Sequence, residues 1–118
     1  MTIKDIVETL DAQVVCGEEH LEKEVHNACG SDMMSDVLAF VKDQSVLITG
    51  LCNPQVIRTA EMMDIICVCF VRGKTPDEAM IDLAKERGIT LMRTKMRMFT
   101  ACGTLYEKGL GRSANKCV

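Results

Sequence analysis

Aromatic residues are scarce in this chain: Phe, Trp and Tyr together make up 3% of its 118 residues, and tryptophan is absent. This scarcity argues against a surface that stacks sugars or bases, and it leaves Leu, Ile, Val, Met and Cys to fill the core. No apolar run reaches the length of a bilayer-spanning helix. The formal net charge is −3, so the chain as a whole does not attract nucleic acid or anionic membranes. We therefore expect a soluble protein that binds neither.

Motifs for common catalytic chemistry are also missing. The sequence contains no nucleophile and base pair, no paired-carboxylate motif and no Walker sequence. Gly50, Gly73 and Lys74 do not form a phosphate loop, because the GxxxxGK[ST] spacing is absent. We therefore predict that the protein is not an enzyme and has no resident cofactor.

Cysteine, in contrast, is abundant. The seven cysteines are odd in number, with no paired CxxC spacing and no secretory signal, which predicts a cytoplasmic protein. Cys67 and Cys69 lie two apart in an apolar run and point to one face of a strand. We predict that they and Cys16 fill the core, because free cysteine is among the most buried residue types. His20 and His26 lack a second ligand at metal spacing and are predicted to be surface or strand residues.

The organisation of the chain is clearest in residues 65–94, which read IICVCFVRGKTPDEAMIDLAKERGITLMRT. The unbroken apolar run at residues 65–71, rich in β-branched side chains, is typical of a central parallel strand buried on both faces. Residues 89–92 form a second apolar run and predict another strand. The stretch between them therefore predicts a helix that connects two strands of one sheet.

The start and end of that helix are marked in the sequence. Thr75 as N-cap, Pro76 as first helical residue and Glu78 three residues after the cap together predict the start. Gly88 predicts the end. The apolar face is predicted to comprise Ala79, Met80, Leu83 and Ala84.

A similar unit precedes it. Residues 45–49 predict a short strand, and Asn53 as cap with Pro54 as first residue predicts a helix. This helix is predicted to bury Val56, Ile57, Ala60 and Met63.

The ends of the chain predict further elements. Thr2 and Asp5 indicate a short first helix, and residues 12–16 and 24–29 predict strands. Ser31 is predicted to cap a helix with the apolar residues Met33, Met34, Val37, Leu38 and Val41. Thr94 is predicted to cap a last helix, ended by Gly109, that carries Met98, Phe99, Cys102, Leu105 and Tyr106. The methionine pairs Met33-Met34 and Met62-Met63 are interpreted as core and helix-packing residues rather than a groove for a partner.

Alternating strands and helices predict an α/β fold, a three-layer α/β/α arrangement with a mainly parallel sheet. We expect residues 1–110 to form a single domain. Residues 111–118 are rich in Gly, Ser, Asn and Lys and are predicted to be a mobile tail.

Two segments resemble the DRTGG domain. TPDEAMIDLAKERGITLMRTKMRMFTACGTLY is similar to the end of that domain and to the N-terminal domain of HPr kinase/phosphorylase, and SDMMSDVLAFVKDQSVLITG resembles its preceding helix and strand. The chain departs from the family pattern after that strand. Gly50-Leu51-Cys52-Asn53-Pro54 stands where an Asp-Arg pair is expected, and a terminal Thr-Gly-Gly is absent.

The resemblance implies a fold like the N-terminal domain of HPr kinase/phosphorylase and a non-catalytic, regulatory or dimer-forming module. It also implies occurrence beside CBS domains in regulated pyrophosphatases, and an association of stand-alone versions with iron hydrogenase genes. From this we expect a homodimer that binds a small anionic ligand or a protein partner.

A ligand site is predicted where three strands end and lead toward helices. Parallel strands end at one edge of a sheet, where ligands usually bind. Cations are unfavourable beside helix N-termini, yet the loops there are basic, as a bound nucleotide phosphate would require. The predicted ligand residues are Gly50, Asn53, Arg72, Gly73, Lys74, Thr75, Arg93, Thr94 and Lys95. The alternative is that the long cationic side chains only reach solvent or pair with carboxylates.

A second function class remains open from the sequence. Cys29, Cys52 and Cys102 could serve a redox or iron–sulfur-handling protein, although their spacing is no known cluster signature. A small anion-dependent enzyme is a third alternative.

Overall fold

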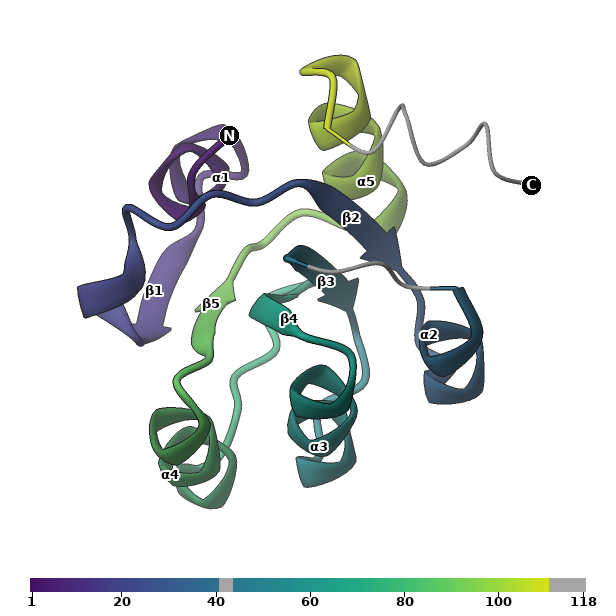
Figure 1. Cartoon of the computed structure of the whole chain (residues 1–118). Coiled ribbons are helices and arrows are strands. Elements are labelled where there is room, and N and C mark those ends of the chain that lie inside the picture. Colours follow the sequence, from purple (N-terminus) through teal and green to yellow (C-terminus); the bar gives the residue numbers. More distant parts are fainter. Residues whose placement is uncertain (41–43, 111–118) are drawn as a thin grey trace.

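A five-stranded sheet of order β1-β5-β4-β3-β2 separates two layers of helices (Figure 1). The computed structural model describes residues 1–40 and 44–110. In chain order the elements are α1 (Ile3–Thr9), β1 (Gln13–Cys16), the 3-10 helix η1 (Glu18–His20), β2 (Asn27–Gly30), α2 (Met34–Phe40), β3 (Ser45–Thr49), α3 (Pro54–Met62), β4 (Ile65–Phe70), α4 (Glu78–Arg87), β5 (Thr90–Arg93) and α5 (Met98–Glu107).

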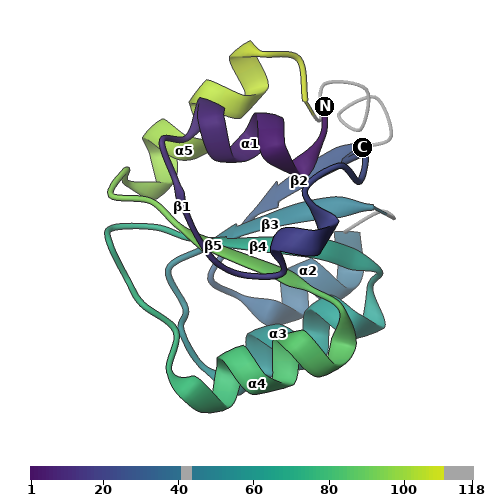
Figure 2. The same ribbon diagram turned by 90° about the vertical axis from the view of Figure 1, so that its left-hand side faces the viewer.

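The sheet is parallel except at one edge. β2, β3, β4 and β5 pair in parallel, whereas β1 pairs with β5 in the antiparallel sense. Helices α1 and α5 cover one face of the sheet, and α2, α3 and α4 cover the other (Figures 1 and 2). The predicted three-layer α/β/α fold with a mainly parallel sheet is therefore confirmed.

Successive side chains of the central strands point to opposite faces of the sheet and contribute to a core on each face. All five residues of β3 are buried: Val46 and Ile48 join the core under α1 and α5, while Leu47 joins the core under α2, α3 and α4. Cys67 and Cys69 of β4 both lie in the first core, as predicted from their spacing, and Cys16 is buried in the second.

Several helix ends follow the sequence signals closely. Thr2 and Asp5 form a reciprocal capping box at the start of α1, which satisfies two backbone N–H groups. Asn53 caps α3 ahead of Pro54. Gly88 ends α4 with φ +71°, a left-handed conformation that glycine adopts without steric cost.

Three predicted helix starts are wrong. α2 begins at Met34, two residues later than the Ser31 cap implied, and the hydroxyl of Ser31 accepts from the N–H of Met33 ahead of the helix. The N-cap of α4 is Asp77, whose side chain accepts a hydrogen bond from the backbone N–H of Met80 at 2.9 Å, and the helix begins two residues later than the Thr75 cap implied. A short carboxylate is at least as good a cap as threonine. The N-cap of α5 is Arg97, because the hydroxyl of Thr94 is bonded elsewhere and does not cap the helix.

Six residues predicted to lie on packed faces are exposed instead. Ala79 is exposed on α4. Met33 is 61% exposed, Leu38 41%, Met62 70%, Phe99 89% and Tyr106 47%. α5 packs on the sheet through Ala101 and Leu105, one turn apart, so the position of Phe99 turns outward. Met34 and Met63, the other members of the two methionine pairs, do pack against the core under α2, α3 and α4.

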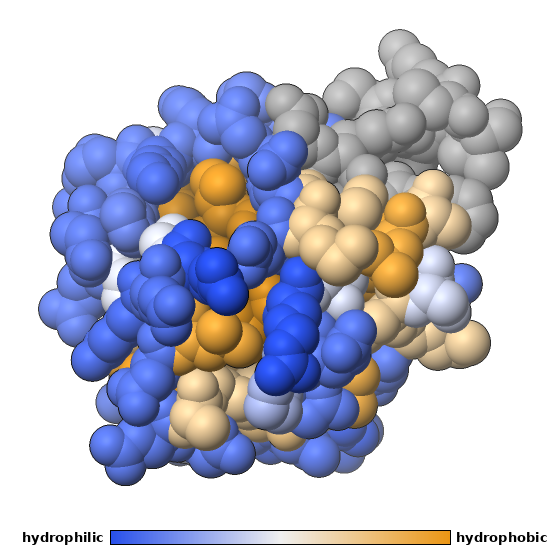
Figure 3. Space-filling model, turned by 60° about the horizontal axis from the view of Figure 1, so that its bottom comes forward, coloured by the Kyte–Doolittle hydropathy of each residue, from blue (hydrophilic) through white to orange (hydrophobic). Residues whose placement is uncertain are grey.

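Apolar side chains reach the surface in more than one area. With the bottom of Figure 1 turned forward, they show near the centre of Figure 3 and on its right-hand side, which is the side of α2 in Figure 1. Leu38 of α2 is another large apolar residue exposed there. Val41 and residues 111–118, for which packing and a mobile tail were predicted, lie outside the described residues.

Candidate ligand site at the carboxyl ends of the strands

The predicted ligand residues follow three strands that end side by side. In the parallel register Thr49 of β3 pairs with Phe70 of β4, and Phe70 pairs with Arg93 of β5. Their connections therefore emerge at one edge of the sheet, where open α/β sheets usually bind ligands. Two separate cavities lie along this edge.

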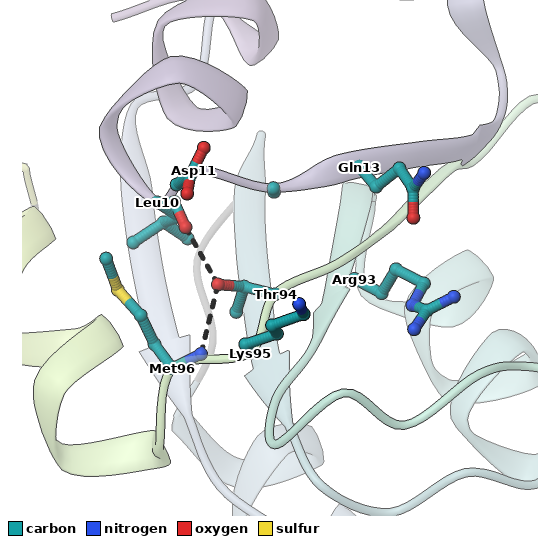
Figure 4. Close-up of a pocket in the computed structure, with 8 residues that line it drawn as sticks. Leu10, Asp11, Gln13, Arg93, Thr94, Lys95 and Met96 are labelled. Atoms are coloured by element: carbon teal, nitrogen blue, oxygen red, sulfur yellow. Dashed lines mark hydrogen bonds between the residues drawn. The ribbon is translucent and has the colours of Figure 1, made fainter.

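The first cavity holds two of the predicted cations. Its volume is about 400 Å³, and its lining comprises Leu10, Asp11, Ala12, Gln13, Arg93, Thr94, Lys95 and Met96 (Figure 4). β1 contributes Gln13, which pairs with Arg93 across the antiparallel ladder. The side chains of Gln13 and Arg93 extend toward the same side in Figure 4.

Thr94 fixes the wall of this first cavity. Its buried hydroxyl donates to the backbone oxygen of Leu10 at 2.7 Å and accepts from the backbone N–H of Met96 at 3.2 Å. The residue therefore joins the end of α1 to the segment after β5. Arg93 and Lys95, its two neighbours in the chain, are held on this connection.

The second cavity lies between three connections. Its volume is about 500 Å³, and its lining comprises Asp32, Val71, Arg72, Arg97, Met98 and Phe99. Asp32 comes from the β2–α2 connection, Arg72 from the β4–α4 connection and Arg97 from the start of α5.

The backbone N–H of Gly50, which was predicted to bind a ligand, donates instead to a carboxylate of the protein. Oδ1 of Asp32 accepts from the N–H of Gly50 at 2.7 Å and from the hydroxyl of Thr49 at 3.0 Å. The bond from Gly50 holds the pKa of Asp32 below its usual value, with further lowering by Thr49 and by the nearby Arg72, while partial burial acts in the opposite direction. The Gly50 amide thus binds an internal anion.

Arg72 lies directly over Gly50. A Cβ added at Gly50 would come 2.5 Å from Nη2 of Arg72 and 3.5 Å from Oδ1 of Asp32, so a larger residue at this position would displace the guanidinium. The backbone of Arg72 has φ +58°, which is uncommon outside glycine. Its N–H donates to the oxygen of Met96 at 2.8 Å, and this bond ties the β4–α4 connection to the segment before α5.

The remaining predicted residues lie outside both cavities. Asn53 uses its side chain to cap α3. The N–H of Gly73 donates to the oxygen of Thr94 at 2.8 Å. Lys74 and Thr75 are exposed on the β4–α4 connection, and Lys74 lies close enough to Cys52 to favour its thiolate. The structure therefore groups Arg93, Thr94 and Lys95, and places Arg72 in the second cavity.

Sequence reasoning missed five polar or aromatic lining residues: Asp11, Gln13, Asp32, Arg97 and Phe99. Asp32 could have been predicted, because it follows β2, which is parallel to β3, β4 and β5 and therefore ends at the same edge of the sheet. Gln13 could not be found in this way, because its approach to Arg93 depends on the antiparallel pairing of β1.

The cysteines predicted for the redox alternative pack on both faces of the sheet. Cys29 and Cys52 pack against the core under α2, α3 and α4, whereas Cys102 packs against the core under α1 and α5. Burial raises the pKa of each of these thiols, and proximity to Cys102 adds to the shift of Cys29. Within residues 1–40 and 44–110, no three His, Cys, Asp or Glu side chains lie close enough to hold a metal ion together.

Within residues 1–40 and 44–110, no helix combines the length and the apolar character that crossing a bilayer requires.

Comparisons with known proteins connect this geometry to a family. The family model of the DRTGG domain matches residues 5–107. Among solved structures, the fold is similar to the CBS and DRTGG domains of the regulatory region of Clostridium perfringens pyrophosphatase, complexed with its activator diadenosine tetraphosphate. The TM-score is 0.69 at 22% sequence identity. The match covers 87% of this chain and 45% of the other, so this chain spans less than half the length of that one. No curated protein matches the sequence.

Proposed function

Because the chain belongs to the DRTGG domain family, we propose that it is a non-enzymatic regulatory domain that senses a small phosphate-bearing ligand at the carboxyl edge of its sheet. One observation carries the proposal. Arg93 and Lys95 line the same cavity beside Gln13, at the edge where open parallel sheets bind ligands.

The charges of this first cavity suit an anion. It combines two cations, Arg93 and Lys95, with one carboxylate, Asp11. Within the described residues neither cation makes a salt bridge, so both can face a ligand. An arginine guanidinium matches phosphate through paired hydrogen bonds, and a lysine adds a point charge.

The size and rigidity of the cavity also support the proposal. A volume of about 400 Å³ lies within the range of about 300–1,000 Å³ that small-molecule sites usually have. The buried hydroxyl of Thr94 holds the backbone between the two cations in one position. A site whose groups are already in place loses less freedom on binding.

The similar pyrophosphatase structure supports the ligand class. That protein's CBS and DRTGG domains form a regulatory region, and its structure holds an activator with a chain of phosphates. For the present chain we infer a ligand of the same broad chemistry, a nucleotide or a related polyphosphate.

Self-association and a cytoplasmic location are further parts of the proposal. Exposed large apolar residues often mark an interaction site. Met33, just before α2, Leu38 of α2 and Met62 of α3 are all exposed. These residues support the predicted homodimer. The cytoplasmic location rests on the pattern of cysteine usage.

A thermal-shift experiment tests the ligand. Pyrophosphate and diadenosine tetraphosphate should each raise the melting temperature of the full chain by about 4 °C or more at saturation, through mass action. The shift should decline as salt is added, because exposed charges are screened.

Matched variants test the site. Arg93→Gln and Lys95→Gln should each reduce the shift, and the double variant should remove it. Arg58→Gln, which removes an exposed cation of α3, should retain it. If neither compound stabilises the wild-type chain, the ligand-sensing proposal is wrong, and a docking or dimerisation module becomes the better explanation.

A further inference from the structure

The cavity lined by Arg72, Arg97 and Phe99 has chemistry of its own. It shares no lining residue with the cavity of Arg93 and Lys95. Its volume of about 500 Å³ also falls in the range of about 300–1,000 Å³ that is usual for small-molecule sites. It is therefore large enough to hold a small molecule.

Two guanidinium groups provide an anion-binding end. Arg72 and Arg97 are both exposed and reach the cavity from different connections. Within the part of the chain that the structure describes, neither makes a salt bridge. Two arginines at one cavity are suited to the oxygens of a phosphate, and the carboxylate of Asp32, near Arg72, balances part of their charge.

An aromatic ring lies at the same cavity. The chain has only three Phe and one Tyr, yet Phe99 lines this cavity with 89% of its surface exposed. Its position on the outward side of α5 leaves a ring face accessible. Aromatic rings stack on nucleobases with little dependence on base identity. Low aromatic content argued against a base-stacking surface, but here a single ring is enough.

A carboxylate limits the charge of the ligand. Asp32 lines the cavity with an exposed side chain, and its Oδ1 is fixed by Gly50 and Thr49. A carboxylate can accept hydrogen bonds from ribose hydroxyls, as acidic residues do in dinucleotide sites. Its negative charge also offsets one of the two arginines, which disfavours a polyphosphate more than a monophosphate.

The backbone at Arg72 adopts a left-handed conformation. A non-glycine residue at φ +58° is strained, and such strain gathers at functional sites. The N–H of Arg72 is bonded to Met96, so the turn that carries the guanidinium is tied to the segment that leads into Arg97.

From these contacts we propose that the cavity of Asp32, Arg72, Arg97 and Phe99 binds a nucleoside 5′-monophosphate. Arg72 and Arg97 bind the phosphate, Phe99 stacks on the base and Asp32 accepts from the ribose. This is a second site, distinct from the site of the proposed function.

The test uses adenosine 5′-monophosphate as probe and isothermal titration of the full chain. The monophosphate should bind more tightly than adenosine, than inorganic phosphate and than adenosine triphosphate. Arg97→Gln should weaken its binding about tenfold or more, the loss expected for a charged hydrogen bond. Phe99→Ala should weaken it about fivefold or more through lost stacking.

Two further variants sharpen the result. Asp32→Asn keeps an oxygen that can accept from Gly50, and it should move the preference toward adenosine triphosphate by removing the negative charge. Arg58→Gln on α3 should bind the monophosphate as the wild type does.

Two outcomes would overturn the proposal. In one, the monophosphate binds no more tightly than inorganic phosphate. In the other, binding survives Arg97→Gln and Phe99→Ala but is lost in the Arg93→Gln/Lys95→Gln double variant. The second outcome would locate the nucleotide in the other cavity, and it would leave the proposed function standing while this inference fails.

Discussion

Oδ1 of Asp32 accepts a hydrogen bond from the backbone N–H of Gly50 at 2.7 Å, although the two residues lie 18 positions apart in the chain. The same oxygen accepts from the hydroxyl of Thr49 at 3.0 Å. The start of the β2–α2 connection is thereby fixed to the end of β3. One side of the second cavity depends on this contact.

Asp32→Ala should lower the free energy of unfolding by about 1 kcal/mol at pH 7, the usual net value of such hydrogen bonds at a partly exposed site. The native contacts lower the pKa of Asp32, so its ionised form stabilises the fold above the ordinary value of 3.8, and this stabilisation is lost as pH falls below it. Urea unfolding of wild type and variant should therefore differ less at pH 3. Asp82→Ala, at an exposed position of α4, is the control. A difference that does not depend on pH would contradict the assigned role.

Arg72→Gly should be about 1 kcal/mol more stable than Arg72→Ala, because alanine retains the cost of the left-handed backbone and glycine does not. The φ of +58° at Arg72 is the basis for this order. At Arg58, inside α3, the order of stability should reverse. Arg58→Ala should be more stable than Arg58→Gly, because glycine is unfavourable in a helix. Chemical denaturation of the four variants measures both differences. Equal stability of the two Arg72 variants would mean that the backbone is not strained there.

The sequence predicted those parts of the fold that depend on neighbouring residues. The capping box of Thr2 and Asp5 and the Asn53-Pro54 start were found because their partners lie within three positions. The start of α4 was misplaced because Thr75 and Asp77 are both acceptable caps, and only the bond to Met80 distinguishes them.

The candidate site was harder to predict because it depends on contacts between distant segments. Parallel strands bring their ends together, so the common edge of Arg72 and Arg93 could be expected from the order of elements. The pairing of β1 beside β5, which brings in Gln13, has no local signal. Phe99 was assigned to the wrong face because a helix position near an apolar stripe can fall on either side of its boundary.

Thr94→Val should destabilise the fold by about 1–3 kcal/mol, because it leaves the oxygen of Leu10 and the N–H of Met96 without their partner in a buried place. The shape of the side chain is nearly unchanged, so the loss reports the hydroxyl. Thr100→Val, at an exposed position of α5, should change stability by no more than about 0.5 kcal/mol. Urea unfolding compares the two, and equal effects would show that the hydroxyl contributes little.

The thiols of Cys67 and Cys69 should be unreactive toward a disulfide reagent in the native protein. Burial raises the pKa of both, that of Cys69 to about 12, so the thiolate that reacts is nearly absent at pH 8. Both thiols should react after unfolding in urea. In the folded state, raising the pH from 7 to 9 should not make them reactive. The Cys67→Val/Cys69→Val variant should lose two reactive groups when unfolded and none when native. Rapid native labelling of either residue would contradict their place in the core.

The chain should form a dimer of twice its 13.1 kDa mass at micromolar concentration, as multi-angle light scattering can measure. Two-fold symmetry is the commonest arrangement of small homo-oligomers, and a dimer would cover the exposed apolar residues on and around α2 and α3. Met33→Lys and Met62→Lys place a charge at positions that are 61% and 70% exposed. Each should shift the mass toward the monomer, because a charge buried in an interface is costly.

Thr100→Lys is the matched control, because it adds the same charge at an exposed position of α5, in the opposite helical layer. All three substitutions should leave the midpoint of unfolding nearly unchanged at low protein concentration, since exposed replacements alter stability by no more than about 0.5 kcal/mol. A wild-type chain of monomer mass would refute the dimer. A dimer that only Thr100→Lys disrupts would locate the interface on α5, where a partner would lie near Phe99 and the second cavity.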